Sequence, residues 1–509
     1  MKKLLVMLVI VMTFSGAFAQ LSVTNQTQIT LSNDDEVSLM ELGKKGFVVI
    51  KNTKSEESRK LRTWSFTLYN PELEVVWTKS MDFEKNLYLL AMSTFEGDIN
   101  LVYFIDNNGS EGLVDGQKVG DLTVMKITSD GEFNKKDIEF KDKIRLYKGN
   151  FVNGAYYFDA TDKKQDVIMK IDFSTLSLSS NRLSLPEKTD IFDRTNDGKY
   201  MYFRVSSYKK KFEYDAFYTI DDGVVIEKTP LKRGKDEEYV FMKVLKPDST
   251  HRFMLRLTNK EILGERKKDD KIVYSYYLTN MEKEDLQTAN KIDQKASNEL
   301  YMDRKIELKN KFFSTYYLIM GSGDILSSCF RCNDKNFVTF DKYQKVYSQH
   351  TYYDYQTKTT QTYYVFEAYY YTNTIVWCFN DDREIEWTKN FEYDIVSPYL
   401  HEKTCARPYK DNTIALIGHF DNELSYKTIS MDGEVIEGTE NQKVLNKSKF
   451  SDVKQFNNSI THLYGNTYLV WGNDDDNKAD VGSKDKEKEK KKSKNKKTVN
   501  MKFKIVEFE

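Results

Sequence analysis

A hairpin pattern recurs along the whole chain and limits what it can fold into. Each copy has a strand of alternating apolar residues, a turn rich in Asn, Asp and Gly, and a second alternating strand, which is typical of β-hairpins. The clearest copies span residues 124–133, 217–226 and 426–436. Each contains an Asp-Gly pair, which supplies the positive φ angles that a tight turn requires.

Two further hairpins resemble each other in detail. Residues 68–79 and 378–389 share Asn, Glu, Trp, Thr and Lys at the same offsets, including Trp77 and Trp387. We therefore interpret them as copies of one repeat and predict a structural role for both tryptophans. The hairpins start at intervals of roughly 40 to 60 residues, which is the length of a four-stranded propeller blade.

These repeats predict an all-β chain folded as a β-propeller of about seven or eight four-stranded blades; two smaller β domains are the alternative. Segments 155–158, 199–203 and 413–417 are apolar on both faces, as expected for strands buried between neighbouring sheets. Residues 501–508 alternate cleanly and are suited to close the ring by pairing with an early strand. Only residues 280–310 have a helix-like composition, and we favour strand and loop there as well.

The N-terminus has the three parts of an export signal. Lys2 and Lys3 precede an apolar run, and small residues end at Ala19. We expect residues 1–19 to be a signal peptide and residues 20–509 to form one propeller-like domain, periplasmic or extracellular. No later stretch reaches the roughly 20 apolar residues of a transmembrane helix.

Residues 473–498 form a low-complexity segment in which aspartates are followed by a lysine-rich run with interleaved acids. Such a segment cannot bury apolar surface, so we expect a disordered charged loop. Calcium binding by residues 474–480 is a minor alternative, because the spacing of a calcium loop is incomplete. The whole chain has a formal net charge of −1, which does not favour nucleic acid as a partner.

Cysteine and histidine give no clear catalytic signature. Structural disulfides are the favoured interpretation for an exported chain, with buried thiols or a metal or redox pair at 329–332 as alternatives. The candidate cysteines are Cys329, Cys332, Cys378 and Cys405. The histidines lack metal-ligand spacing, and no phosphate loop, dinucleotide motif or nucleophile elbow is present, so no cofactor is predicted. They are His251, His350, His401, His419 and His462.

Tyrosine is concentrated between residues 343 and 371. Adjacent strand residues point to opposite faces, so we expect some of these side chains in the core and others in solvent. Exposed tyrosines suit sugar stacking or a protein interface, although packing within the sheet is the more common use. The candidate binding surface comprises Tyr352, Tyr353, Tyr363, Tyr364, Tyr369 and Tyr371.

The tyrosine-rich strand and the following hairpin, residues 374–389, resemble a family of exported bacterial proteins seen among Bacteroidetes, mainly over residues 312–509. The resemblance implies a propeller-like fold and an envelope or extracellular location, but no activity. The chain departs from the family pattern where the usual Asp-Gly turn reads Asp382-Arg383. The tryptophan hairpins also resemble quinoprotein-type propeller repeats, without the cofactor-binding pattern.

These observations favour a non-enzymatic binding or scaffolding protein of the bacterial cell envelope, acting as a monomer on an unknown protein or glycan. The alternative is a polysaccharide-active enzyme that uses carboxylates in a central funnel. Propeller enzymes assemble such sites from distant blades, so no local motif is required.

Overall fold

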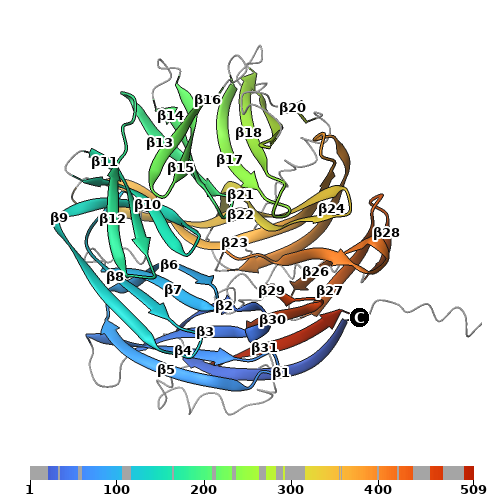
Figure 1. Ribbon diagram of the computed structural model, residues 1–509, viewed down its shortest axis with the longest axis horizontal. Coiled ribbons are helices and arrows are strands. Elements are labelled where there is room, and N and C mark those ends of the chain that lie inside the picture. Colours follow the sequence, from blue (N-terminus) through green and yellow to red (C-terminus); the bar gives the residue numbers. More distant parts are fainter. Residues whose placement is uncertain are drawn as a thin grey trace, which may run out of the picture.

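The computed structural model shows a ring of antiparallel sheets (Figure 1). It describes residues 21–32, 35–54, 60–105, 116–162, 165–208, 214–231, 237–262, 271–282, 290–292, 316–354, 356, 358–397, 400–420, 423–438, 459–473 and 498–508. In these ranges the other regular elements are two short 3₁₀ helices, Gly43–Lys45 and Lys410–Asn412. None of the described helices is long and apolar enough to cross a membrane.

The strands form eight four-stranded blades in chain order. Blade 1 comprises β2 (Glu36–Glu41), β3 (Phe47–Lys54), β4 (Leu61–Tyr69) and β5 (Val75–Glu84). Blade 2 comprises β6 (Leu87–Phe95), β7 (Asp98–Ile105), β8 (Gln117–Ile127) and the first part of β9 (Phe133–Val152). Blade 3 comprises the rest of β9, β10 (Ala155–Asp162), β11 (Gln165–Asp172) and β12 (Ser177–Arg182). Blades 4 and 5 comprise β13 (Thr189–Asn196), β14 (Met201–Ser207), β15 (Asp215–Asp221) and β16 (Val224–Pro230); then β17 (Glu237–Leu245), β18 (Phe253–Ile262), β19 (Lys271–Asn280) and β20 (Asn290–Lys291).

The remaining blades complete the circle. Blades 6 and 7 comprise β21 (Tyr316–Cys332), β22 (Lys335–Asp354), β23 (Thr359–Phe379) and β24 (Ile385–Ser397); then β25 (Thr404–Tyr409), β26 (Thr413–Phe420), β27 (Glu423–Ser430) and β28 (Val435–Gly438). Blade 8 comprises β29 (Ser459–Tyr464), β30 (Thr467–Asn473), β31 (Thr498–Phe508) and the N-terminal β1 (Leu21–Ser32). The predicted fold class, an all-β propeller, is confirmed.

One strand belongs to two blades. Residues 133–139 and 144–146 of β9 pair with β8, and residues 145–146 and 149–152 pair with β10. Strand β9 therefore ends blade 2 and begins blade 3, and its middle pairs with both neighbours. The two blades therefore appear as one seven-stranded sheet.

The ring is closed by strands from both ends of the chain. Strand β1 pairs with β31 in antiparallel register from Leu21 opposite Phe508 to Ser32 opposite Thr498. Figure 1 shows this meeting of the first and last strands, in blue and red. The prediction that residues 501–508 pair with an early strand is therefore confirmed.

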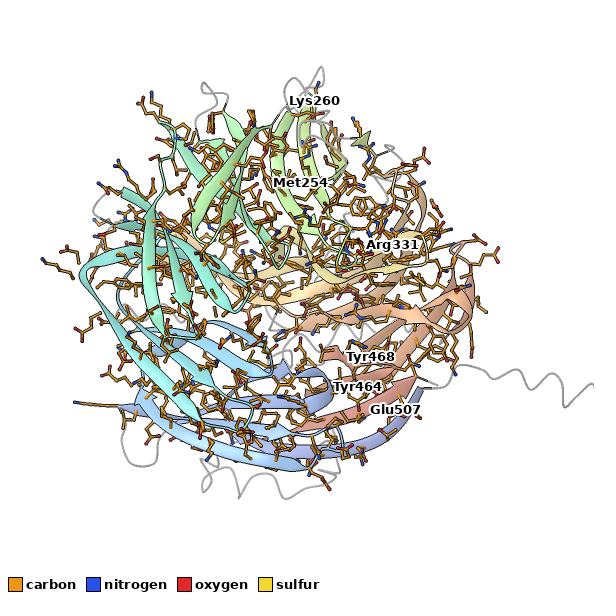
Figure 2. All side chains as sticks on the ribbon, viewed as in Figure 1. Met254, Lys260, Arg331, Tyr464, Tyr468 and Glu507 are labelled. Carbon is orange, nitrogen blue, oxygen red and sulfur yellow. The ribbon has the colours of Figure 1, made fainter. Side chains whose placement is uncertain are left out.

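Each gap between neighbouring blades holds its own apolar core, and side chains fill these gaps around the ring (Figure 2). Successive strand residues point to opposite faces, so one strand supplies two cores. In β3, Val48 packs toward blade 2 and Val49 toward blade 8. Because both faces of a blade are covered, its middle strands are apolar at nearly every position, as the sequence predicts.

The two repeat tryptophans join neighbouring blades. Trp77 of blade 1 donates its indole N–H to the carbonyl of Ser129 in blade 2, at 3.1 Å. Trp387 of blade 6 donates in the same way to Met431 in blade 7, at 2.8 Å. Each ring lies against a glycine of that turn, Gly131 or Gly433. Each tryptophan hairpin thus forms an inter-blade joint with an Asp-Gly hairpin of the next blade: residues 68–79 with 124–133, and residues 378–389 with 426–436.

Four turns that link the third and fourth strands of a blade have the same geometry. In each turn, the backbone N–H of the first residue donates to the carbonyl of the fifth, and the N–H of the fourth donates to the carbonyl of the first. The side-chain oxygen of the first residue accepts the backbone N–H of the fifth, which is Glu in all four turns. The turns span 70–74, 128–132, 380–384 and 430–434. The fourth residue is left-handed in all of them: Leu73, Gly131, Arg383 and Gly433. Arg383 therefore occupies the glycine position of the usual turn.

We predict that the joint makes Gly433 intolerant of a side chain. An added Cβ would lie 2.7 Å from the Trp387 ring, whereas at Gly465, also at positive φ, it would meet nothing within 4 Å. Gly465→Ala should cost about 1 kcal/mol of unfolding free energy through its backbone alone. Gly433→Ala should cost about 1–3 kcal/mol more, because of the clash.

Urea unfolding of the two variants measures this difference. In a Trp387→Ala background the extra cost of Gly433→Ala should disappear, because the clashing ring is gone. Equal losses for the two glycine variants in the native background would show that the ring contact does not restrict this position.

Candidate functional site

The first strands of the blades face the ring axis and line two cavities. The larger, of about 630 Å³, is bordered by the inner strands β9, β13, β17 and β21, together with residues of β18, β22 and β23. The smaller, of about 350 Å³, is bordered by β2, β6, β21, β25 and β29. Together they involve the inner strand of every blade. We call this space the central channel.

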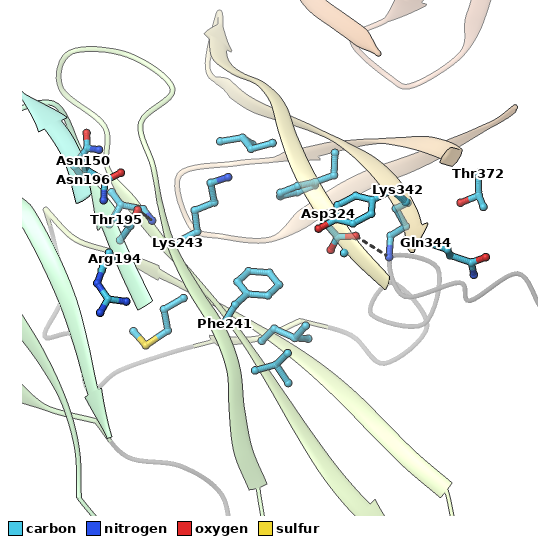
Figure 3. A pocket seen from close by; sticks show the side chains of 18 residues that line it. Asn150, Arg194, Thr195, Asn196, Phe241, Lys243, Asp324, Lys342, Gln344 and Thr372 are labelled. Carbon is cyan, nitrogen blue, oxygen red and sulfur yellow. Dashed lines mark hydrogen bonds and ion pairs between the residues drawn. The ribbon is translucent and has the colours of Figure 1, made fainter. Parts of the chain in front are cut away.

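The larger cavity lies beside the apolar core that blades 5 and 6 share. Phe241, Leu326 and Phe340 form an apolar part of the wall. Asn150 and Asn196 face them with polar side chains (Figure 3).

Two of the three cations on this wall are paired. Arg194 donates to Asp159 at 2.7 Å, and the Lys342 ammonium lies 3.4 Å from the Asp324 carboxylate. The side-chain amine of Lys243, which lies in the middle of the cavity in Figure 3, makes no hydrogen bond or ion pair with any residue that the structure describes. Partial burial lowers the pKa of Lys243, although Glu402 and Asp324 partly oppose this.

The smaller cavity brings two carboxylates together. Glu41 ends β2, and Glu402 lies just before β25. Both carboxylates reach solvent inside the channel, but the surrounding protein leaves their charged forms poorly hydrated. This burial raises the pKa of both groups, and the charge of Glu402 raises that of Glu41 further.

The two cavities are electrostatically connected. Glu402 of the smaller cavity and Lys243 of the larger each act on the pKa of the other. The channel therefore gathers an amine whose pKa is lowered and carboxyls whose pKa values are raised. Such opposed shifts are typical of acid–base sites, although structural charge networks also produce them.

A buried carboxylate holds the segment that carries Glu402. Asp341 is fully buried and accepts hydrogen bonds from the backbone N–H groups of Lys403, at 2.7 Å, and Thr404, at 3.1 Å. It also accepts the hydroxyls of Thr404, Thr374 and Tyr393. Blade 6 thereby fixes the start of blade 7, and with it the direction in which Glu402 enters the channel.

Lys403 is buried beside this network. Its ammonium lies 3.3 Å from the Ser397 hydroxyl and 5.1 Å from the centre of the Tyr371 ring. Burial lowers the pKa of Lys403 to about 8, against the attraction of Asp341 and Glu402. Tyr371 completes the support, since its hydroxyl donates to the His401 carbonyl at 2.8 Å.

The candidate tyrosines divide by position along the chain. Strands β22 and β23 extend as a hairpin beyond their blade, and Tyr352, Tyr353, Tyr363 and Tyr364 on it are 46–48% exposed. Tyr371 is fully buried, and Tyr369 is partly buried. Some of the tyrosines therefore lie in the core and others reach solvent, as expected. The division follows position along the strand, because neither face of the hairpin end is covered, whereas both faces of the blade are. The exposed group stays a predicted binding surface.

The four cysteines are free thiols in the structure, which does not support the predicted disulfides. Cys329 and Cys332 lie three residues apart on β21 and therefore point to opposite faces. Cys329 packs between blades 5 and 6, and Cys332 between blades 6 and 7 with Cys378. Cys405 belongs to the core between blades 7 and 8.

The histidines are more informative than their spacing indicates. His401 and His462 both line the smaller cavity, and burial lowers the pKa of His401 to about 4. His251 pairs with Asp248, and His350 stacks on Tyr363. No three His, Cys, Asp or Glu side chains among the described residues are placed to hold a metal ion.

Several predictions fall outside the described residues. These are the signal peptide at 1–19, almost all of the charged loop at 473–498, including the aspartates at 474–480, and most of the helix-like segment at 280–310.

Sequence analysis did not identify Lys243, Glu402 or Glu41. Each has ordinary neighbours in the sequence, and the ring alone brings them together. The one available signal was that Glu41 and Lys243 interrupt apolar patterns near inner strands.

No protein-family model and no curated protein matches the chain. Solved structures similar to it include an ACO/RPE65 chimera, with 11% identity and a TM-score of 0.32, covering 50% of this chain and 60% of that one. A mutant of Synechocystis apocarotenoid oxygenase has 9% identity, the same TM-score and the same coverage. The match therefore spans 60% of the length of these structures. The resemblance to the exported Bacteroidetes family stays a prediction.

The comparison corrects the predicted function. A non-enzymatic binding or scaffolding protein was favoured, with a polysaccharide-active enzyme as the alternative, but the similar solved structures are apocarotenoid oxygenases. The prediction of a non-enzymatic role therefore disagrees with the similar structures and is not kept. At this level of similarity the oxygenase reaction is not transferred to this chain.

We predict that Lys403 makes stability depend on pH. Its folded pKa, about 8, lies below its ordinary value of 10.5, so between these values the unfolded chain binds more protons. The contribution of Lys403 to the unfolding free energy should therefore rise with pH in this window, by at most about 1.4 kcal/mol per pH unit.

Urea unfolding of native protein and Lys403→Met, from about pH 7 to pH 10, isolates this contribution. The stability of the native protein relative to the variant should increase above pH 8. Lys118→Met, at an exposed site, should leave the pH profile unchanged. A difference between native protein and Lys403→Met that stays constant with pH would contradict the prediction.

Proposed function

We propose that this chain is an enzyme that performs acid–base chemistry on a small polar molecule in the central channel. The observation that carries the proposal is that Lys243 and Glu402 line the two cavities of the channel and that each charge acts on the pKa of the other group. Their pKa values are shifted in opposite directions, and both side chains line cavities on the ring axis.

The directions of the shifts define the roles. A carboxyl whose pKa is raised keeps its proton closer to neutral pH and can donate it, so Glu402 is the general acid. An amine whose pKa is lowered is more often neutral and can accept a proton or attack an electrophile, so Lys243 is the base or nucleophile. Glu402 in turn raises the pKa of Glu41 through like-charge repulsion, so Glu41 is a second carboxyl that favours its protonated form.

The size and lining of the larger cavity favour a small substrate. Its volume of about 630 Å³ is in the range of sites for small organic molecules. The wall combines the apolar side chains of Phe241 and Phe340 with the amides of Asn150, Asn196 and Gln344. This combination suits a compact molecule with a hydrocarbon part and several polar groups.

A search for turnover in heavy water tests the proposal. Purified protein is incubated with a mixture of small metabolites in D₂O, and mass spectrometry follows compounds that are consumed or gain deuterium. The native protein should convert at least one compound. Glu402→Gln and Lys243→Met should each slow this conversion by about 10²-fold or more.

Glu132→Gln is the matched control, because Glu132 is exposed in a turn and lines neither cavity. It should react at the native rate. Conversion that persists in both channel variants, or no conversion of any compound by the native protein, would reject an acid–base site in the channel.

We also propose that the chain is exported by residues 1–19. Support comes from the basic start, the apolar run and the small residues before Gln20. Expression of the full chain in a bacterium should give an exported protein whose first residue is Gln20. Protein that keeps Met1 and remains in the cytoplasm would contradict this proposal.

A further inference from the structure

We infer that Lys243 is a nucleophilic amine that forms an imine with a small polar aldehyde or ketone bound in the larger cavity of the channel. The inference rests on the proposed function and names its substrate class. It is carried by the position of Lys243 in the cavity and by the lack of a partner for its amine among the described residues.

The backbone around Lys243 is firmly held. Met242 and Val244, on either side, are buried in the core between blades 4 and 5. Lys243 therefore points the other way, toward the gap between blades 5 and 6, where Phe241 and Leu257 line the same cavity. A lysine on a rigid inner strand is presented to the cavity in a restricted range of positions.

Neighbouring charges do not neutralise the Lys243 amine by direct contact. Asp324, the acid across the cavity, is paired with Lys342 of β22, and Arg194 of β13 is paired with Asp159. Asp324, Cys329 and Glu402 act on Lys243 through the electric field. They favour its protonated form, yet burial outweighs them and lowers its pKa, so more of the amine is neutral near pH 7 than at the protein surface.

The reaction needs no oxidant or reductant. The nitrogen lone pair of Lys243 attacks the carbonyl carbon, a C–N bond forms, and the carbonyl π electrons move to oxygen. A proton passes from nitrogen to that oxygen, giving a carbinolamine. Protonation of the hydroxyl by solvent in the cavity then lets water leave as the nitrogen lone pair forms the C=N bond, and the second nitrogen proton returns to solvent. The net change is amine plus carbonyl compound to imine plus water.

Reductive trapping tests the inference on the native protein. The protein is treated with sodium cyanoborohydride and pyruvate, or acetaldehyde, at neutral pH, and the modified lysines are located by peptide mass spectrometry. With at least one of these carbonyl compounds, Lys243 should be labelled about 10-fold faster than the exposed Lys118. Labelling of Lys243 no faster than Lys118 with both compounds would overturn the inference.

Two controls separate an organised site from general lysine reactivity. In urea the preference for Lys243 should disappear, because the cavity is lost. In Lys141→Met, which removes an exposed lysine that does not line the cavity, the preference should remain. A preference that survives unfolding would mean local sequence causes it, and would overturn the inference.

The result is separable from the test of the proposed function. Selective trapping at Lys243 without any metabolite conversion would support the imine-forming amine while the proposed turnover fails. Conversion that needs Glu402 but survives Lys243→Met, without selective trapping, would retain an acid–base channel and reject the imine.

Discussion

The pairing of β1 with β31 is the contact on which the rest of the molecule depends. A blade is apolar on both faces, so a row of blades exposes one such face at each end. Joining the two chain ends in blade 8 removes both exposed faces at once, since that blade packs on blade 7 through Val506 and on blade 1 through Phe503. The hydrogen bonds of residues 21–32 with 498–508 therefore complete a set of eight cores that would otherwise be open.

Ring closure also creates the site. Lys243, Glu402 and Glu41 come from blades 5, 7 and 1, and only a closed ring brings them to a common axis. Inner strands are held by cores on either side, so their channel-facing residues need not contribute to packing. Polar and ionisable side chains can be placed there at little cost in stability, which is a general reason why propellers carry chemistry on their axis.

The sequence was informative where local geometry decides the structure. Period-two alternation, turn glycines and the Trp77 and Trp387 repeats lead to the correct class, because a strand buried on two faces and a left-handed turn each demand particular residues. The exact blade count was not accessible, since β9 passes from one blade to the next without a turn to mark the boundary. The turn at Arg383 likewise adopts the glycine conformation without glycine.

The site could not be predicted for a different physical reason. A pKa shift depends on the protein that surrounds a group, and for Glu402 burial acts together with the charges of Asp341 and Lys243, which are distant in sequence. The same holds for the tyrosines, where coverage by neighbouring blades decides that Tyr371 is buried and Tyr363 exposed. Charge placed in a narrow, solvent-accessible channel is partly dehydrated without being sealed off. In the proposed enzyme, a substrate would therefore reach groups whose proton affinities the fold has already moved toward neutrality.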